Sequence, residues 1–129
     1  MKIPEQMLFT STHEWVAVEG SRATIGITAF AADQLADIVL VSLPKVGQSI
    51  TAGEPFGEIE SVKSVEDINS PVSGTVIAVN GALDSSPDLV NQEPFGEGWM
   101  IQIELADELE LEDLLSPADY QELLAQERS

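Results

Sequence analysis

Lys63 is the residue of this sequence whose surroundings most clearly ask for a chemical explanation. It is one of three lysines in a chain of 129 residues with a formal net charge of −18. Acidic residues lie close to it at Glu60 and Glu66, and its immediate neighbours Val62 and Ser64 are β-branched or small. A primary amine in this setting could be a catalytic nucleophile, a charged surface residue or a point of covalent modification.

Catalysis by the Lys63 amine is the weakest of these three hypotheses. A Schiff-base lysine needs surroundings that favour the neutral amine, whereas neighbouring carboxylates favour the charged ammonium. A charged residue that protects a strand edge is the commonest role for a single surface lysine. Acylation by another enzyme requires an amine on a rigid turn without bulky neighbours, a condition that Ser61, Val62 and Ser64 meet.

The residues on both sides of Lys63 predict a β-hairpin with the lysine at its tip. Residues 56–62 have the pattern of a strand that approaches Lys63, and residues 65–68 have that of a strand that leaves it. Gly53 and Gly74 flank the unit almost evenly. At the tip, the amine would face solvent, where another protein could reach it.

Another hairpin and a short helix are predicted before residue 40. Residues 15–19 and 22–27 flank Gly20-Ser21, which is typical of a two-residue hairpin turn. Thr28 can then cap a short, alanine-rich helix over residues 29–36. The two strands should pair antiparallel.

Further strands make a mainly β fold the best prediction. Residues 37–43 alternate too little for a half-exposed strand and predict a buried one. Residues 74–80 and 98–105 predict two more strands, joined by a connection over 81–97 that is rich in Pro, Asn and Gly. Several short strands separated by turns indicate a small β-sandwich or flattened barrel.

The end of the chain changes character and predicts helices. Ser116-Pro117 is a cap followed by proline at the first helical position. We therefore expect one domain over residues 1–129, with a core at about 10–105 and a helical segment at about 106–129. Two apolar stripes at helical spacing lie in this segment: Leu111, Leu114 and Leu115, and then Tyr120, Leu123 and Leu124.

Composition argues against several classes of function. The chain has no cysteine and a single histidine, His13, which leaves little for a metal site or a Ser-His-Asp arrangement. With 23 acidic and 5 basic side chains, it should repel nucleic acid and favour basic protein partners, or simply stay soluble. No apolar run is long enough to span a membrane, and neither a signal nor a transit peptide is evident. A cytoplasmic bacterial protein is expected; a mitochondrial origin would require a removed transit peptide.

Motifs around Lys63 resemble those of the lipoyl and biotinyl carrier family, in which a prosthetic group is amide-linked to a hairpin lysine. They are Pro44-x-Val46-Gly47, Gly53, Glu60-Ser61-Val62-Lys63 and Pro71-x-Ser73-Gly74. More narrowly, about residues 10–115 are similar to the H proteins of the glycine cleavage system. The matching motifs, in order, are His13-Glu14-Trp15, Gly26-Ile27-Thr28, Asp37-Ile38-Val39, Glu60-Ser61-Val62-Lys63, Ser70-Pro71-Val72-Ser73-Gly74, Val79-Asn80, Val90-Asn91 and Gly96-Glu97-Gly98-Trp99.

Neighbouring branches of the carrier family fit less well. Biotin carriers usually have methionines beside the lysine, where Val62 and Ser64 stand here, and lipoyl domains of 2-oxo acid dehydrogenases usually have aspartate before it. The sequence departs from the H-protein pattern at Ser64, where alanine is usual, at Ala36, where glycine is usual, and at Phe95, where tyrosine is usual. Only Ala36 could matter structurally, because it lacks glycine's access to positive φ after a helix.

The resemblance implies a lipoyl-carrier fold of the barrel-sandwich hybrid type, with lipoic acid as a covalent cofactor on Lys63. The chain would be a non-catalytic carrier subunit, and we expect it to be a monomer. Its arm would take an aminomethyl group from glycine decarboxylase (P protein) and pass it to an aminomethyltransferase (T protein). Dihydrolipoyl dehydrogenase (L protein) would reoxidise the dithiol, and a lipoate ligase or lipoyl transferase would attach the arm.

The same resemblance implies roles for residues away from the lysine. Glu60 and Gly74 correspond to positions recognised by the lipoate-attaching enzyme, although Gly74 could simply be a turn glycine. Family members place the loaded arm in a surface cleft, where Glu14 or Asp67 would hold its ammonium by a charge-assisted hydrogen bond. Both could also be ordinary surface acids, and His13 could be a packing or hydrogen-bonding residue beside Trp15. The residues that match the cleft are Thr12, His13, Glu14, Ile27 and Asp67.

Three rival functions stay open from the sequence. The nearest is an H-like lipoyl donor or relay protein that serves other lipoate-dependent enzymes. A second is an unmodified acidic interaction protein. A stand-alone enzyme ranks last, because the chain lacks the usual catalytic side chains.

Overall fold

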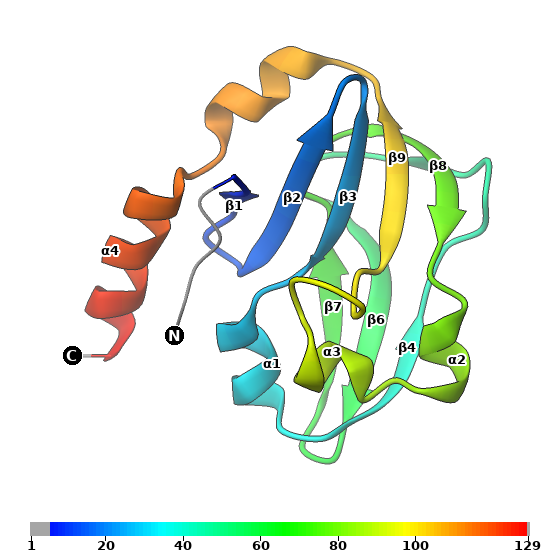
Figure 1. Cartoon of the computed structure of the whole chain (residues 1–129), viewed down its shortest axis with the longest axis vertical. Coiled ribbons are helices and arrows are strands. Elements are labelled where there is room, and N and C mark those ends of the chain that lie inside the picture. Colours follow the sequence, from blue (N-terminus) through cyan, green and yellow to red (C-terminus); the bar gives the residue numbers. More distant parts are fainter. Residues whose placement is uncertain (1–5, 129) are drawn as a thin grey trace.

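Two antiparallel sheets dominate the computed structural model, which describes residues 6–128 (Figure 1). The larger sheet has the strand order β1-β2-β3-β9-β8-β5, and the smaller one has the order β4-β6-β7. The strands are β1 (Leu8–Phe9), β2 (Glu14–Glu19), β3 (Arg22–Ile27), β4 (Ile38–Ser42), β5 (Ser49–Ile50), β6 (Pro55–Ser61), β7 (Val65–Asn69), β8 (Gly74–Val79) and β9 (Ile101–Leu105). The mainly β fold expected from the sequence is confirmed, as two sheets rather than a closed barrel.

Helical segments lie around the sheets and connect their strands (Figure 1). They are α1 (Ala29–Leu35), α2 (Ala82–Ser85), α3 (Leu89–Gln92), the 3-10 helix η1 (Glu108–Asp113) and α4 (Pro117–Arg128). Among the residues described, none of these helices has the length and apolar character needed to cross a membrane.

Alternating side chains of the two sheets form the main hydrophobic core. On β9, Ile101 and Ile103 are buried whereas Glu104 is exposed, as expected for a strand with one face toward the interior. On β6 and β7, Ile59 and Ile68 are buried in the same core cluster. The hairpin that carries Lys63 is therefore anchored by apolar side chains on its inner face.

Strand β4 corrects the expectation of a fully buried strand. Ile38 and Val41 are buried, but Val39 and Leu40 are exposed. A register shift between Ile38 and Leu40 interrupts the pairing with β6, and β4 is an edge strand of the smaller sheet. A bulge at an edge leaves consecutive apolar side chains facing solvent, which a continuous apolar run in the sequence does not reveal.

The predicted connection over 81–97 contains two short helices that the sequence did not indicate. Leu83 of α2 and Val90 of α3 are buried in the main core. Asn91 joins α3 to the start of β4, because its Oδ1 accepts from the Ile38 N–H (3.0 Å) and its Nδ2 donates to the Ala36 carbonyl (2.7 Å). The connection is thus part of the packed structure.

The predicted helical face of Leu111, Leu114 and Leu115 is wrong. The 3-10 helix ends at Asp113, and Leu115 pairs as an extended residue with Phe9 through hydrogen bonds of 2.9 and 2.7 Å. The short strand β1, which the sequence did not indicate either, supplies this partner. Backbone pairing between distant segments therefore overrides the local helical spacing.

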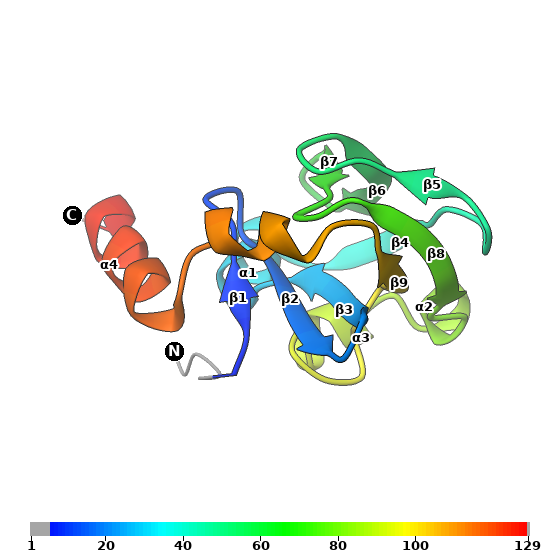
Figure 2. The ribbon, with the colours of Figure 1, turned by 90° about the horizontal axis from the view of Figure 1, so that it is seen from above.

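Helix α4 confirms the second helical prediction. The Ser116 Oγ accepts from the Asp119 N–H (3.1 Å), and Pro117 is the first helical residue. Tyr120 and Leu124 are buried in a second apolar cluster, where the Tyr120 ring stacks on Phe9 at a centroid distance of 4.6 Å. Figure 2 shows α4 beside β1, at the end of the molecule away from β8.

Candidate functional site

The tip of the β6–β7 hairpin presents Lys63 on a turn held by one serine. The Oγ of the buried Ser61 accepts from the backbone N–H groups of Lys63 (3.1 Å) and Ser64 (3.2 Å). The Ser61 N–H donates to the Ser64 carbonyl (2.8 Å), and the Val62 N–H donates to the Asp37 carbonyl (3.0 Å). Every residue of the tip is thereby fixed through its backbone.

The Lys63 side chain itself is exposed. Among residues 6–128, the ion pair found joins His13 to Glu127, so none of the carboxylates near Lys63 holds its amine. An accessible amine on a fixed backbone is what a modifying enzyme needs. The hairpin prediction is confirmed in its strands and in the position of the lysine between them.

Glu60 and Gly74 occupy different settings. Glu60 is exposed on β6, opposite Leu40 of β4 and Val65 of β7. Gly74 is the first residue of β8 rather than a turn residue, which corrects the alternative of a turn glycine. A Cβ at Gly74 would lie 2.2 Å from the Glu104 carbonyl oxygen, so glycine is required there by the close approach of two strands. Recognition by a lipoate-attaching enzyme stays a prediction for both residues.

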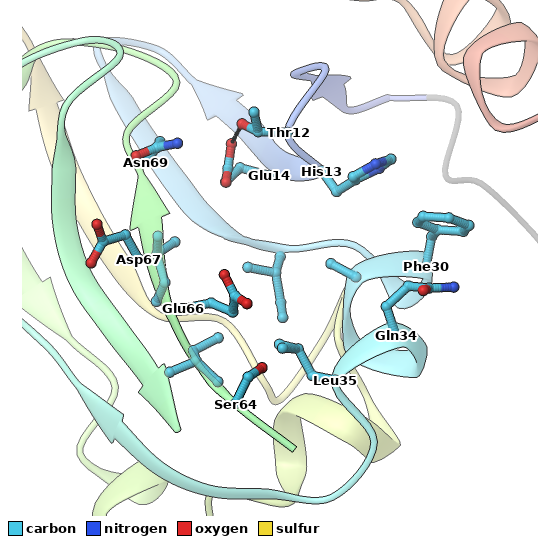
Figure 3. Close-up of a pocket in the computed structure, with 14 residues that line it drawn as sticks. Thr12, His13, Glu14, Phe30, Gln34, Leu35, Ser64, Glu66, Asp67 and Asn69 are labelled. Atoms are coloured by element: carbon cyan, nitrogen blue, oxygen red, sulfur yellow. Dashed lines mark hydrogen bonds between the residues drawn. The ribbon is translucent and has the colours of Figure 1, made fainter. Parts of the chain in front are cut away.

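A pocket of about 500 Å³ lies between α1, the turn before β2 and strand β7 (Figure 3). The five residues expected to line a cleft, which are distant in sequence, all border this pocket. Its size is within the usual range for small-molecule sites. The lining residues are Thr12, His13, Glu14, Ile27, Phe30, Ala31, Gln34, Leu35, Ile59, Ser64, Glu66, Asp67, Ile68 and Asn69.

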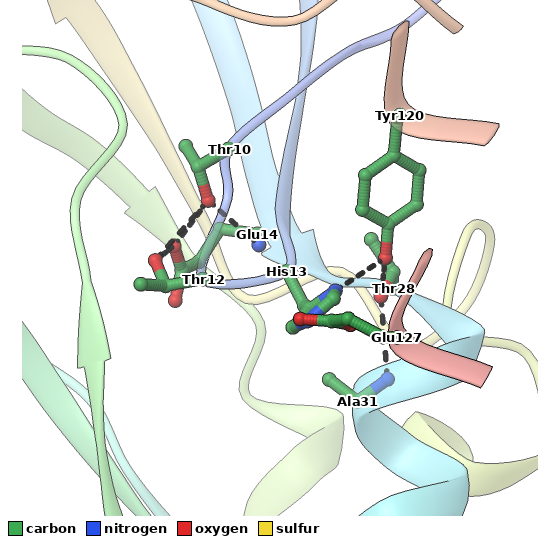
Figure 4. A network of polar contacts seen from close by, with 8 residues as sticks. All are labelled: Thr10, Thr12, His13, Glu14, Thr28, Ala31, Tyr120 and Glu127. Carbon is green, nitrogen blue, oxygen red and sulfur yellow. Dashed lines mark hydrogen bonds and ion pairs between the residues drawn. The ribbon is translucent and has the colours of Figure 1, made fainter. Parts of the chain in front are cut away.

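Glu14 is a buried carboxylate at this pocket, with 3% of its surface exposed. Its Oε1 accepts hydrogen bonds from the hydroxyls of Thr10 (2.6 Å) and Thr12 (2.5 Å), as Figure 4 shows. Burial raises the pKa of Glu14 above its ordinary value of 4.5, and the threonine hydrogen bonds oppose this effect. A cation that entered the pocket would stabilise the charged form.

His13 is held by the C-terminal helix. Its Nδ1 lies 2.8 Å from the Tyr120 hydroxyl, and its Nε2 lies 3.0 Å from the Glu127 carboxylate (Figure 4). The ring centroid is 4.6 Å from that of Phe30. His13 also has a φ of 73°, an uncommon value outside glycine. The ring contacts of His13 are with Phe30 and Tyr120 rather than with Trp15, the neighbour expected from the sequence, and both of its ring nitrogens have polar partners.

The two acids of β7 differ in direction. Glu66 projects from the strand toward α1, whereas Asp67 projects to the other side (Figure 3). Because side chains of a strand alternate, Glu66 shares its face with the buried Ile68, and Asp67 lies at the rim. The sequence prediction named Asp67 and missed Glu66, although the alternation with Ile68 was a signal for it.

Helix α1 supplies a wall that the sequence prediction also missed. Phe30 and Gln34 lie one helical turn apart, as do Ala31 and Leu35, so all four share one side of α1. Their spacing indicates a common face, but only the fold shows that this face borders the turn before β2 and strand β7.

The pocket offers an acidic group beside apolar walls. Glu14 provides a desolvated carboxylate, and Ile27 and Leu35 are among the apolar side chains nearby. This combination suits a long apolar chain that ends in a cation. The lipoyl group has such a chain, and a bound aminomethyl group adds the cation, so the residues present fit it.

Comparison with known proteins supports the family resemblance inferred from the sequence motifs. Residues 7–127 match the family model described as "Glycine cleavage H-protein". The chain belongs to the glycine cleavage H-protein family. A family member from Rubrobacter xylanophilus, named glycine cleavage system H protein, is 52% identical over 126 residues, which are 98% of each chain. The protein of the same name from Bacillus subtilis is 49% identical over 123 residues, covering 95% of this chain and 97% of its own.

A solved structure of the family supports the fold. The crystal structure of a glycine cleavage system H protein from Mycobacterium marinum has a TM-score of 0.83 and 33% sequence identity. The match covers 98% of this chain and 100% of the other. The resemblance inferred from the motifs around Lys63, and the H-protein fold that it implied, are therefore confirmed.

Proposed function

We propose that this chain is the lipoyl-bearing shuttle subunit of a glycine cleavage system and has no catalytic activity of its own. The observation that carries the proposal is the exposed Lys63 amine on a fixed hairpin, in a protein that also has a pocket with the buried carboxylate of Glu14. Membership of the H-protein family supports the same role.

Each part of the site has a task in this proposal. Lys63 Nζ would hold the lipoyl group through an amide, and Ser61 would keep the attachment point fixed. When bound, the lipoyl group supplies a dithiol that carries an aminomethyl group and is later reoxidised. Glu14 would accept a hydrogen bond from the cationic end of the arm, and Ile27 and Leu35 would exclude water around it.

The partners in this proposal are the three other components of glycine cleavage and an attaching enzyme. They are glycine decarboxylase, the aminomethyltransferase, dihydrolipoyl dehydrogenase, and a lipoate ligase or lipoyl transferase. The names of the relatives support a place in this system. We include a cytoplasmic location and a monomeric state in the proposal; the bacterial origin of these relatives supports the location.

The proposal is tested by glycine-dependent exchange of labelled carbon dioxide into glycine. The assay combines a glycine decarboxylase with the lipoylated chain, with Lys63→Arg, and with Lys45→Arg as the matched control at another exposed lysine. We expect exchange with the lipoylated wild type and with Lys45→Arg, and none with Lys63→Arg. A lipoylated wild type without exchange would overturn the shuttle function and favour a lipoyl relay.

A further inference from the structure

Tyr120 of helix α4 reaches the region of the pocket from the end of the chain. Its side chain is fully buried, and its ring stacks on that of Phe9 at a centroid distance of 4.6 Å and an interplanar angle of 6°. Because this stacking fixes the plane of the ring, the hydroxyl at its end has a fixed place beside the turn before β2 (Figure 4).

The Tyr120 hydroxyl joins two elements that line the pocket. It donates to the Oγ1 of Thr28 (2.7 Å), and the same Thr28 oxygen caps helix α1 by accepting from the Ala31 N–H (3.3 Å). Since this donation uses the one hydroxyl proton, the Tyr120 oxygen accepts from Nδ1 of His13 (2.8 Å). One hydroxyl thus links the start of α1 to the turn that contains His13.

His13 has a backbone conformation that depends on its surroundings. Its φ of 73° is uncommon outside glycine, and such conformations persist where the neighbouring structure determines them. The His13 N–H donates to the Thr10 carbonyl (3.1 Å), and the His13 carbonyl accepts from the Thr28 N–H (2.9 Å). Nε2 of its ring lies 3.0 Å from the Glu127 carboxylate, an ion pair when the ring carries both protons. Helix α4 therefore holds the ring, and the turn and Thr28 hold the backbone.

The turn that α4 holds is also the support of the Glu14 carboxylate. Glu14 follows His13 directly, and the hydroxyls that bind its Oε1 belong to Thr10 and Thr12 of the same turn. A shift of the turn would move the carboxylate and both of its hydroxyl donors. The position of this group in the pocket therefore depends on how firmly the His13 ring is held.

Electrostatics link the same two sites. Burial, with the charges of Glu127 and Glu14, raises the pKa of Tyr120 to about 12, and the hydrogen bond with Thr28 opposes this effect. The Tyr120 hydroxyl therefore keeps its proton at neutral pH and can donate to Thr28 there.

We infer that Tyr120, supported by Glu127, is a positioning residue for Glu14, because it fixes the turn of residues 10–13 against α1 and so keeps the pocket in the form that retains the cationic end of the arm. The identity of this ligand rests on the proposed function. The simpler alternative is that these contacts only fasten α4 to the rest of the fold. In that case their loss would lower the Tm and leave the properties of Glu14 unchanged.

Two variants remove the contacts and change the packing little. Tyr120→Phe removes the hydroxyl and keeps a ring that can stack on Phe9. Glu127→Gln removes the charge that faces His13 and leaves the Tyr120 ring in place. Glu122→Gln is the matched control, because it makes the same change at another exposed position of α4. Circular dichroism establishes that each variant is folded.

The first measurement is the titration of the Glu14 carboxyl by carbon-13 NMR in the unmodified full chain. Burial is the largest cause of the raised pKa of Glu14, so a loosened turn that admits water should bring this pKa nearer to 4.5. We expect this change in Tyr120→Phe and the wild-type value in Glu122→Gln. A pKa of Glu14 that stays at the wild-type value or rises in folded Tyr120→Phe would overturn the inference.

The second measurement follows the loaded arm. The lipoylated chain is loaded by a glycine decarboxylase with glycine and then separated from that enzyme. Loss of the aminomethyl group to one water molecule breaks the sulfur–carbon bond, restores the thiol and yields formaldehyde and ammonium. The rate at which formaldehyde appears therefore reports how well the pocket excludes water.

We expect release to be about threefold faster in Tyr120→Phe, the effect of one hydrogen bond, and within about 1.5-fold of wild type in Glu122→Gln. Glu127→Gln should also accelerate release. A residue that acts through Glu14 has no further effect once that carboxylate is gone, so Tyr120→Phe should not accelerate release in a Glu14→Gln background.

Two results of this measurement would overturn the inference. One is release at the wild-type rate from both Tyr120→Phe and Glu127→Gln, and the other is equal acceleration by Tyr120→Phe with and without Glu14. A lipoylated wild type that takes up no aminomethyl group would instead contradict the proposed function. The titration, which needs neither lipoate nor a partner enzyme, would then decide whether Tyr120 positions Glu14.

Discussion

Glu14 is a buried carboxylate whose charge has no cationic partner among the described residues. Its carboxylate is buried, and the hydroxyls of Thr10 and Thr12 are its hydrogen-bond partners. These neutral donors both bind Oε1 and do not balance the charge, and burial raises the pKa of Glu14. A cation in the pocket would supply the positive charge that the Glu14 carboxylate lacks.

The raised pKa of Glu14 predicts a defined pH dependence of stability. Between its ordinary value of 4.5 and the raised value, the folded chain binds this proton more tightly than the unfolded chain. The Glu14 contribution to the free energy of unfolding is therefore full below 4.5 and is lost as pH rises through the raised pKa. Glu14→Gln removes this loss, so the Tm of the variant relative to wild type should increase as pH rises.

Thermal unfolding followed by circular dichroism at several pH values checks this prediction. The control is Glu19→Gln on the same strand, at an exposed position, and we expect its Tm difference from wild type to change less with pH. A Glu14→Gln difference that stays constant, or moves in favour of wild type as pH rises, would show that Glu14 is not held in a costly environment.

At the scale of elements, the end of α1 contains a strained residue. Ala36 follows the helix with a φ of 61° and a ψ of −145°, a backbone conformation that glycine adopts more easily than alanine. The sequence already indicated this position, because glycine is usual there in the family that the chain resembles. Ala36 also holds Asn91 through its carbonyl, so the strained backbone joins α1 to α3.

Ala36→Gly should therefore stabilise the protein. Relief of backbone strain outweighs the greater freedom of glycine in the unfolded chain, and we expect an increase of about 1 kcal/mol in the free energy of unfolding. Urea denaturation measures it. The matched control is Ala125→Gly, an exposed position within α4, which should lose about 1 kcal/mol because glycine is a poor helix former. Equal losses at both positions would contradict strain at Ala36.

Local sequence patterns correctly predicted the elements whose conformation does not depend on distant parts of the chain. The hairpin turn at Gly20, the cap at Thr28 and the start of α4 at Pro117 all follow from local chemistry. Strand β4 and the segment after residue 110 do not. The bulge near Val39 and the pairing of Leu115 with Phe9 depend on distant strands, which spacing along the sequence does not report.

At the scale of the whole molecule, the fold brings together residues that the sequence separates. The pocket is lined by the turn before β2, helix α1 and strand β7. The C-terminal helix α4 contacts the same region, because the Tyr120 hydroxyl lies within hydrogen-bond distance of the His13 ring. Family motifs named five of the lining residues, and alternation with Ile68 could have placed Glu66 on the inner face, but the wall formed by α1 needed the tertiary structure. The hairpin tip, by contrast, follows from the sequence around Lys63.

The most direct test of the carrier function is the intact mass of the full chain after incubation with lipoate, ATP and a lipoate ligase. Wild type and Lys45→Arg should each gain one lipoyl group, and Lys63→Arg should gain none, because the accessible amine of the hairpin is the attachment point. An unmodified wild type, or a Lys63→Arg variant that still gains a lipoyl group, would contradict it.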